Sequence, residues 1–336
     1  MKQKLIAVAQ SALGLGILGF IIYRLHAKGE LEELGAAFQA AAGNWPTLLL
    51  GASLFAVCLV FCALRWKLLL HAIGIHIRLG RIFVLYMVGH FFNAFLFGST
   101  GGDVVKAYYV SSETDHKKTE VVATVFIDRI LGLLALVGLS VTMLLLRLQF
   151  FLSHPQTRIA VFFNAAVLIG TVLGLVIVFR KNVFEHFSLF RRLEEQTAVG
   201  RIIGKVYNAF RLCLNHPGLL SRALLLSLAN HVTLIVSVYF LGSAIGLKLR
   251  FMEYLTIFPT INSVAALPLT PGGIGTREAA AAELLGVFGV SSADAVTVSL
   301  LIWASVFAWS LLGGVVYCFF SISRGGKMIT SPPEEA

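Results

Sequence analysis

The chain has 336 residues, of which 57% are hydrophobic and only 13% are charged. Because soluble domains carry about 25% charged residues, this composition excludes a sizeable soluble domain and indicates an all-α polytopic membrane protein. The formal net charge is +10, and in a membrane protein such a surplus sets topology or meets anionic lipid head groups rather than nucleic acid. The four cysteines form no C-x-x-C pair, so we expect no metal and no cofactor.

Six runs are long and apolar enough to cross a bilayer as helices, since a crossing takes about 20 residues. The first run follows Lys2 and Lys4 and has no small-x-small cleavage site after it, so we expect it to stay as a helix. Two further stretches, 31–42 and 180–222, have apolar residues at helical spacing and are predicted to lie on the membrane surface. The predicted spans are 5–23, 46–64, 121–146, 159–179, 219–247 and 295–320.

Two other apolar segments are interrupted by polar residues, prolines and glycines. Segment 82–97 contains His90 and Asn93 and runs into the sequence GSTGGD, and segment 251–285 contains three prolines and paired glycines. Irregular backbone at membrane depth persists only where it is buried in protein or lines a wet cavity. We therefore predict re-entrant helical hairpins at 82–110 and 251–285.

The distribution of Lys and Arg favours this topology. With the N-terminus inside and both hairpins re-entrant, most Lys and Arg residues lie in cytoplasmic loops, whereas a full crossing by 82–97 would place the excess outside. The same arrangement predicts that both termini are cytoplasmic.

This topology makes the chain a single membrane domain, 1–336, with two inverted halves. The first half is 46–146, the second is 219–320, and the cytoplasmic amphipathic connector 180–218 precedes the second half. Both hairpin tips have a Gly-Gly pair and then a cation five residues after the first glycine: TGGDVVK at 100–106 and PGGIGTR at 271–277. Inverted repeats with broken helices are a recurrent transporter plan, with the binding site at the midplane.

The two tips have the residue types of an anion site. Paired glycines allow close backbone approach, a helix N-terminus favours an anion, and a Lys or Arg one turn later adds a full charge. Alternatively, the glycines only permit tight turns and the cations extend to the head groups. The candidate lipid-phosphate-binding residues are Gly101, Gly102, Lys106, Gly272, Gly273, Thr276 and Arg277.

Four other charged residues are candidates for gating or coupling, because charges at membrane depth face a cavity or a partner. Asp103 either caps its helix or pairs with Lys106, and Asp128 with Arg129 either anchors a helix end or gates. Glu278 either binds a coupling proton or forms a salt bridge. Side chains expected to form interhelical hydrogen bonds are His90, Asn93, Asn230 and His231.

Three motifs carry a resemblance to a known family. They are GSTGGD at 98–103 with Lys106 and Tyr108, then Asp128-Arg129, and PLTPGGIGTRE at 268–278. The chain resembles, over almost its whole length, the lysylphosphatidylglycerol synthase transmembrane region, or flippase-like, family. The resemblance implies a multi-pass protein of a bacterial or archaeal inner membrane that acts in a lipid pathway. In the best-known member this region translocates a modified phosphatidylglycerol.

Two classes of function follow. The first is a transporter, flippase or scramblase that moves an anionic phospholipid, polyprenyl lipid or glycolipid between leaflets. The alternative is a membrane-embedded enzyme, or an accessory subunit, of glycosyl transfer, aminoacyl transfer or phosphatase chemistry. We identify no catalytic residue, and the soluble aminoacyl-transferase domain of complete synthases does not follow the membrane region, so we expect no lysyl transfer by this chain alone. The expected partners are the anionic lipid substrate, membrane lipids and an enzyme of lipid synthesis.

Overall fold

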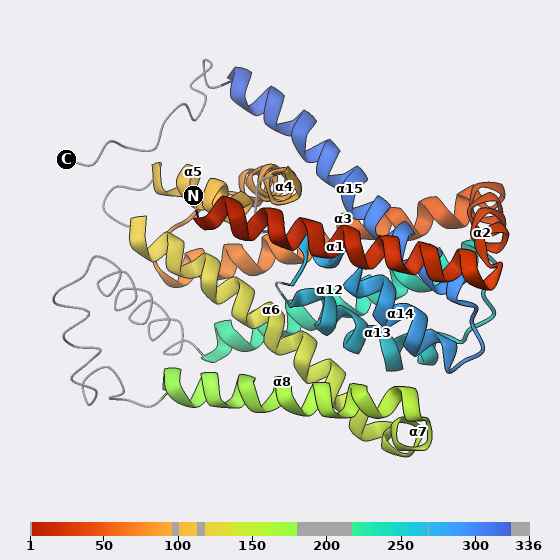
Figure 1. The fold of residues 1–336 in the computed structure, drawn as a ribbon. Helices are drawn as coiled ribbons and strands as arrows, with labels where there is room; N and C mark the ends of the chain where they lie inside the picture. Colours follow the sequence, from red (N-terminus) through yellow and green to blue (C-terminus); the bar gives the residue numbers. More distant parts are fainter. Residues whose placement is uncertain (1, 96–100, 113–117, 180–216, 268, 324–336) are drawn as a thin grey trace.

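The computed structural model describes residues 2–95, 101–112, 118–179, 217–267 and 269–323, and all regular structure in these ranges is helical. Most helices run along one common direction, so that the molecule is a bundle (Figure 1). The helices before residue 147 are α1 (Lys2–Lys28), α2 (Leu31–Gly43), α3 (Trp45–Ala72), α4 (Leu79–Phe95), α5 (Gly101–Ser112) and α6 (Lys118–Leu146).

The remaining described helices complete the bundle. The short α7 (Leu148–Ser153) leads into the long α8 (Pro155–Phe179), and the second half of the chain has two short helices between two long ones. These elements are α12 (Pro217–Ala244), α13 (Phe251–Ala266), the 3-10 helix η1 (Pro271–Gly273), α14 (Thr276–Gly286) and α15 (Ser292–Ser323).

Within the described ranges, six helices are long and apolar enough to cross a membrane, and they correspond to the six predicted spans. The prediction of an all-α polytopic membrane protein is therefore confirmed. α2 confirms that residues 31–42 are helical. The basic stretch predicted between residues 180 and 222 lies mostly outside the described residues.

Most span boundaries differ from their predictions by a few residues, and the end of α3 differs most. The span predicted at 46–64 continues as α3 to Ala72, through Arg65, Trp66 and Lys67. Arg65 and Trp66 are buried, because both side chains find polar partners inside the protein, as described below. The charged residues therefore do not end the helix.

Two chain segments have a similar succession of α-helix lengths. α3, α4, α5 and α6 have 28, 17, 12 and 29 residues, and α12, α13, α14 and α15 have 28, 16, 11 and 32. In each segment the chain passes from a long helix through two short ones to another long helix. The short elements coincide with the two segments predicted to be re-entrant.

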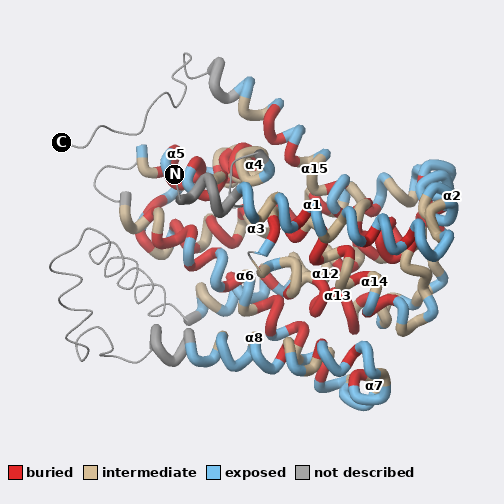
Figure 2. Tube along the Cα trace, in the orientation of Figure 1, coloured by how far each residue is buried: buried red, intermediate tan, exposed pale blue. Residues whose placement is uncertain are grey.

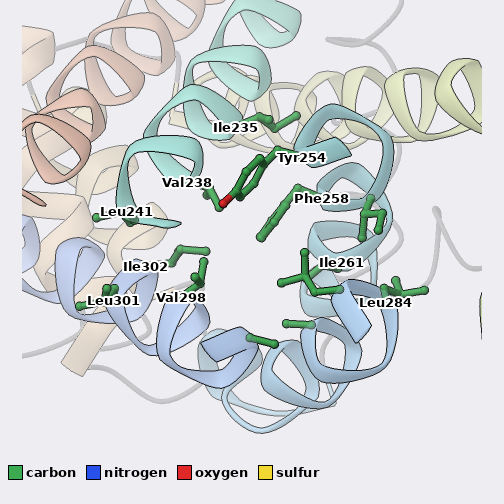
Figure 3. Packing of buried hydrophobic residues seen from close by; sticks show 14 of the residues in the cluster. Ile235, Val238, Leu241, Tyr254, Phe258, Ile261, Leu284, Val298, Leu301 and Ile302 are labelled. Carbon is green, nitrogen blue, oxygen red and sulfur yellow. The ribbon is translucent and has the colours of Figure 1, made fainter. Parts of the chain in front are cut away.

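The buried apolar side chains form two main clusters that follow this division. One gathers residues of α3 to α6, such as Trp66, Ile82 and Val121. The larger one is centred on α12 to α15, where Tyr254 and Phe258 pack among residues such as Ile235, Val238, Ile261 and Val298 (Figure 3).

The outward side chains are also apolar. On α8, Ile159 and Phe162 are about three-quarters exposed, at 75% and 76%, and much of this helix is exposed in Figure 2. Exposed apolar surface on this scale marks contact with a partner or a membrane, and lipid covers it in a spanning helix.

Polar contacts join the spans from inside. Asn164 of α8 accepts a hydrogen bond from Ser140 of α6 at 2.5 Å and donates one to Thr260 of α13 at 3.1 Å. α3 and α12 run antiparallel, because Ser237 donates to the carbonyl oxygen of Gly51 near one end of the pair and Arg65 reaches Ser227 near the other. In a membrane the hydrophobic effect does not drive helices together, because lipid is as apolar as the helix surfaces. Small residues and side-chain hydrogen bonds usually join the helices instead.

Candidate functional site

Five charged residues gather where α3, α5 and α6 meet. We call Arg65, Asp103, Lys106, Asp128 and Arg129 the charge cluster. Arg65, Asp103, Lys106 and Asp128 are each less than 9% exposed. Charges this deeply buried are costly unless each has a partner, so the partners define what the cluster can do.

Asp128 is held from two helices. Its Oδ1 accepts a hydrogen bond from Nε of Arg65 at 2.6 Å, and its Oδ2 accepts one from the Tyr86 hydroxyl at 2.9 Å. The Arg65 guanidinium also donates to the Ser227 hydroxyl of α12 at 2.9 Å. Asp128 and Arg65 therefore tie α3, α4, α6 and α12 together.

Asp103 lies between two cations. Its Oδ1 is 2.9 Å from Nζ of Lys106, one turn later on α5, and its Oδ2 accepts a hydrogen bond from Nε of Arg129 on α6. The sequence left open whether Asp103 caps its helix or pairs with Lys106, and the structure shows the pair. One carboxylate thus faces two cations.

Two aromatic rings complete the surroundings of Lys106. Its ammonium lies 4.1 Å from the centroid of the Tyr86 ring and 5.0 Å from that of Trp66. A ring face attracts a cation, most strongly where water is excluded. The indole N–H of Trp66 in turn donates to Thr124 at 3.1 Å, which fixes the ring.

The first Gly-Gly pair brings two helices into close contact. A Cβ at Gly102 would lie 1.6 Å from the carbonyl oxygen of Gly89 on α4, so only glycine fits. The Gly102 amide donates to the side chain of Asn93 at 2.9 Å. This amide therefore already has a partner, and the cations rather than the Gly102 N–H are what this tip can present to an anion.

A pocket of about 410 Å³ adjoins the charge cluster between α5 and α6. Asp103 and Arg129 are the charged residues in its wall, and the other lining residues include Val104, Tyr108 and Phe126. These three are more than half exposed, at 68%, 51% and 51%. The pocket therefore combines an arginine with an apolar wall that faces outward from the bundle.

The second Gly-Gly tip is built differently. Gly272, Gly273 and Gly275 all have positive φ, at 62°, 75° and 83°, which only glycine adopts readily. Glu278 caps α14, because one of its oxygens accepts the Gly275 amide at 2.5 Å and the other accepts the Ser299 hydroxyl at 2.7 Å. Of the two roles predicted for Glu278, a salt bridge with the neighbouring Arg277 does not form.

Arg277 reaches back over its own tip. Its Nη2 donates to the carbonyl oxygen of Gly272 at 3.1 Å, while its buried Nε has no hydrogen-bond partner among the described residues. Thr276 donates to the Gly273 carbonyl at 3.0 Å. The second tip therefore contains a buried guanidinium donor that no described residue satisfies.

The first helix covers this second tip, which the sequence did not indicate. A Cβ at Gly275 would lie 2.7 Å from the carbonyl oxygen of Gly14, and a Cβ at Gly14 would lie 3.2 Å from that of Ile274. α1 thus packs directly on the loop before α14. A glycine facing the loop is the only trace of this contact in the sequence.

The two tips stay apart. α5 packs against α4 and α6, whereas α14 packs against α13 and α15, and Figure 1 shows α5 at one end of the bundle and α14 well away from it. Each tip therefore belongs to its own half of the chain.

The expected interhelical hydrogen bonds are confirmed for the other polar residues. His90 contacts the carbonyl oxygen of Val306 at 3.3 Å, His231 contacts that of Gly132 at 2.9 Å, and Asn230 accepts from Cys62 at 3.5 Å. The sequence missed Arg65, Tyr86 and Ser227 as members of the buried polar network. Arg65 could have been found, since the apolar run resumes after Lys67 with Leu68, Leu69 and Leu70.

Sequence comparisons identify the family of this chain. The sequence profile of the lysylphosphatidylglycerol synthase TM region matches residues 11–318. This chain belongs to that family. It is also similar to a UPF0104 membrane protein of Pyrococcus horikoshii, with 25% identity over 80% of this chain and 85% of the relative. A UPF0104 membrane protein of Methanothermobacter thermautotrophicus is 23% identical over 96% of this chain and 95% of its own length.

Proposed function

We propose that this family member moves an anionic lipid between the two leaflets of its membrane. The observation that carries the proposal is the outward-facing pocket between α5 and α6, with Arg129 in its wall and the charge cluster directly behind it. An arginine beside apolar surface suits a molecule that is charged at one end and apolar along the rest.

The phosphate group would bind at Arg129. A guanidinium has five N–H donors and forms strong, oriented hydrogen bonds with phosphate oxygens. Arg129 can therefore hold Asp103 and a phosphate together, or exchange one for the other. Since Asp103 also pairs with Lys106, it keeps a cationic partner when Arg129 turns to the lipid, and no charge is left alone.

The acyl chains would remain in the bilayer. Val104, Tyr108 and Phe126 are exposed on the wall of the pocket, so a lipid can place its head group in the pocket while its chains lie along α5 and α6. Only the head group then leaves the lipid phase, which lowers the cost of moving it across.

In this proposal the second tip would bind the same lipid phosphate on the part of its path that lies in the second half of the chain. Arg277 lies on a glycine-rich turn and keeps a donor for which the described residues provide no partner. Inverted repeats typically form one path from two related elements. In this proposal Gly272, Gly273 and Thr276 shape the second tip, and Arg277 supplies its charge.

Reconstitution tests this function. Purified protein in vesicles of phosphatidylcholine with a trace of head-group-labelled phosphatidylglycerol should let an external quencher reach label from both leaflets, whereas empty vesicles should protect about half of it. Mass spectrometry of the extracted lipids should find no new species. A modified lipid would instead support the enzyme alternative, and complete protection of the inner label would refute transport of this lipid.

A further inference from the structure

A second pocket lies between α3 and α12, away from the charge cluster. It has a volume of about 610 Å³ and is lined by Leu64, Lys67, Leu68, His71, Arg222, Leu225, Leu226 and Ala229. Among the described residues, Lys67 and Arg222 are its only lining residues that carry a full charge, and no carboxylate of the described part of the chain contributes to the wall. The structure and the comparisons assign no role to it.

The lining comes from one face of each helix. On α3 and on α12 the contributing residues are spaced i, i+3, i+4 and i+7, which places them in a row along the helix. Because the helices are antiparallel, Lys67 and His71 near the end of α3 lie beside Arg222 near the start of α12. Leu64, Leu225, Leu226 and Ala229 continue toward the centre of the bundle.

Charge and apolar surface are therefore arranged by depth. The basic side chains stand at the end of the bundle, and Leu64, Leu225, Leu226 and Ala229 line the part nearer its middle. Among the described residues Lys67 and Arg222 have no ion-pair partner. His71 packs against the His76 ring, with centroids 4.1 Å apart.

We propose that this pocket binds one anionic phospholipid, with its phosphate between Lys67 and Arg222 and an acyl chain along the leucines. Charge complementarity decides the occupant: two cations without a carboxylate attract an anion, and the apolar remainder of the groove requires that the anion carry a hydrocarbon chain. A soluble phosphate would leave the leucines uncovered. The proposal does not depend on transport, since a lipid retained here need not cross.

Native mass spectrometry of the full chain tests it, using micelles that contain equal amounts of phosphatidylglycerol and phosphatidylcholine. The parent should retain phosphatidylglycerol. The double variant Lys67→Gln with Arg222→Gln should retain one such lipid fewer per chain. Its affinity for that lipid should fall by at least about tenfold, because each of the two basic residues near a lipid surface contributes about fivefold. Exchanging the cations, Lys67→Arg with Arg222→Lys, should keep the lipid.

Matched controls distinguish binding at this pocket from general electrostatic attraction between the basic protein and an anionic lipid. Arg158→Gln with Lys248→Gln removes the same charge from exposed positions elsewhere and should leave retention unchanged. The proposal is overturned if the first double variant binds like the parent, or if phosphatidylcholine is retained equally. An adduct of inorganic phosphate in micelles of phosphatidylcholine alone, or a lipid-free dimer, would also overturn it.

Discussion

Asp128 is the residue on which the charge cluster depends most. It is 2% exposed, and both of its oxygens accept hydrogen bonds, from Arg65 and from Tyr86. Removing one member of a buried ion pair leaves the other charge without compensation, which costs more than the pair contributes.

We therefore expect Asp128→Asn to lower the free energy of unfolding by about 3 to 5 kcal/mol. The apolar double variant Arg65→Met with Asp128→Leu should recover most of this loss, because neither charge of this pair remains buried. Thermal unfolding in detergent measures both. The control Asp294→Asn, in the first turn of α15, should cost only about 0.3 to 1 kcal/mol. Equal stability of Asp128→Asn and the parent would show that Arg65 does not need this carboxylate.

The sequence predicted most charged residues of the charge cluster, but it did not predict which of them pair with one another. Asp103, Asp128 and Arg129 are predicted as candidates because charges at membrane depth face a cavity or a partner, and Lys106 is predicted from its place after the Gly-Gly pair. The pairing differs from the simplest expectation, since the adjacent Asp128 and Arg129 bind Arg65 and Asp103 rather than acting as one pair. Neighbours on a helix point in different directions, so a sequence alone does not tell which distant residue each one meets.

The contact between α4 and α5 depends on glycine. Gly89 and Gly102 face each other so closely that an added Cβ at Gly102 would reach the Gly89 carbonyl oxygen at 1.6 Å. The Gly-Gly pair predicts either close approach of a phosphate or a tight turn, whereas in the structure Gly102 has a packing role. Close approach of a phosphate and close contact between two helices both require glycine, so the sequence alone does not distinguish these two roles.

Gly102→Ala should accordingly separate the two helices and destabilise the protein by about 4 kcal/mol or more, in the range of severe core disruption. Gly138→Ala is the matched control: Gly138 lies within α6 and a Cβ there meets nothing within 4 Å. That change should be neutral or stabilise by up to about 1 kcal/mol. Chemical denaturation of both variants in mixed micelles compares them. If Gly102→Ala tolerates denaturant as well as Gly138→Ala does, the close contact is wrong.

At the scale of the whole chain we propose two inverted halves, each with a re-entrant hairpin. The repeated element lengths and the two apolar clusters support this organisation. The six spans could be predicted from their length and hydropathy, whereas the docking of α1 on the second tip could not, because it depends on shape rather than on pattern.

Cysteine labelling tests whether the two halves have inverted orientations in the membrane. In a variant without native cysteines, Arg78→Cys before α4 and Glu120→Cys at the start of α6 should react from the same side of the membrane, the cytoplasmic one. Arg250→Cys before α13 and Ser291→Cys before α15 should both react from the opposite side. If residues 79–112 crossed the membrane, Arg78→Cys and Glu120→Cys would react from different sides.

The most direct test of the account is the rate at which labelled phosphatidylglycerol changes leaflet when Arg129 is altered. Arg129→Gln should slow exchange by about tenfold or more, since a charge-assisted hydrogen bond is worth about 1.5 to 3 kcal/mol. The exchange rate of Arg129→Lys should lie between those of the parent and Arg129→Gln, because lysine keeps the positive charge but lacks the planar guanidinium with its paired N–H donors. The control variant Arg158→Gln, at an exposed position, should exchange the labelled lipid at the parent rate. Exchange by folded Arg129→Gln at the parent rate would contradict a lipid path through the charge cluster.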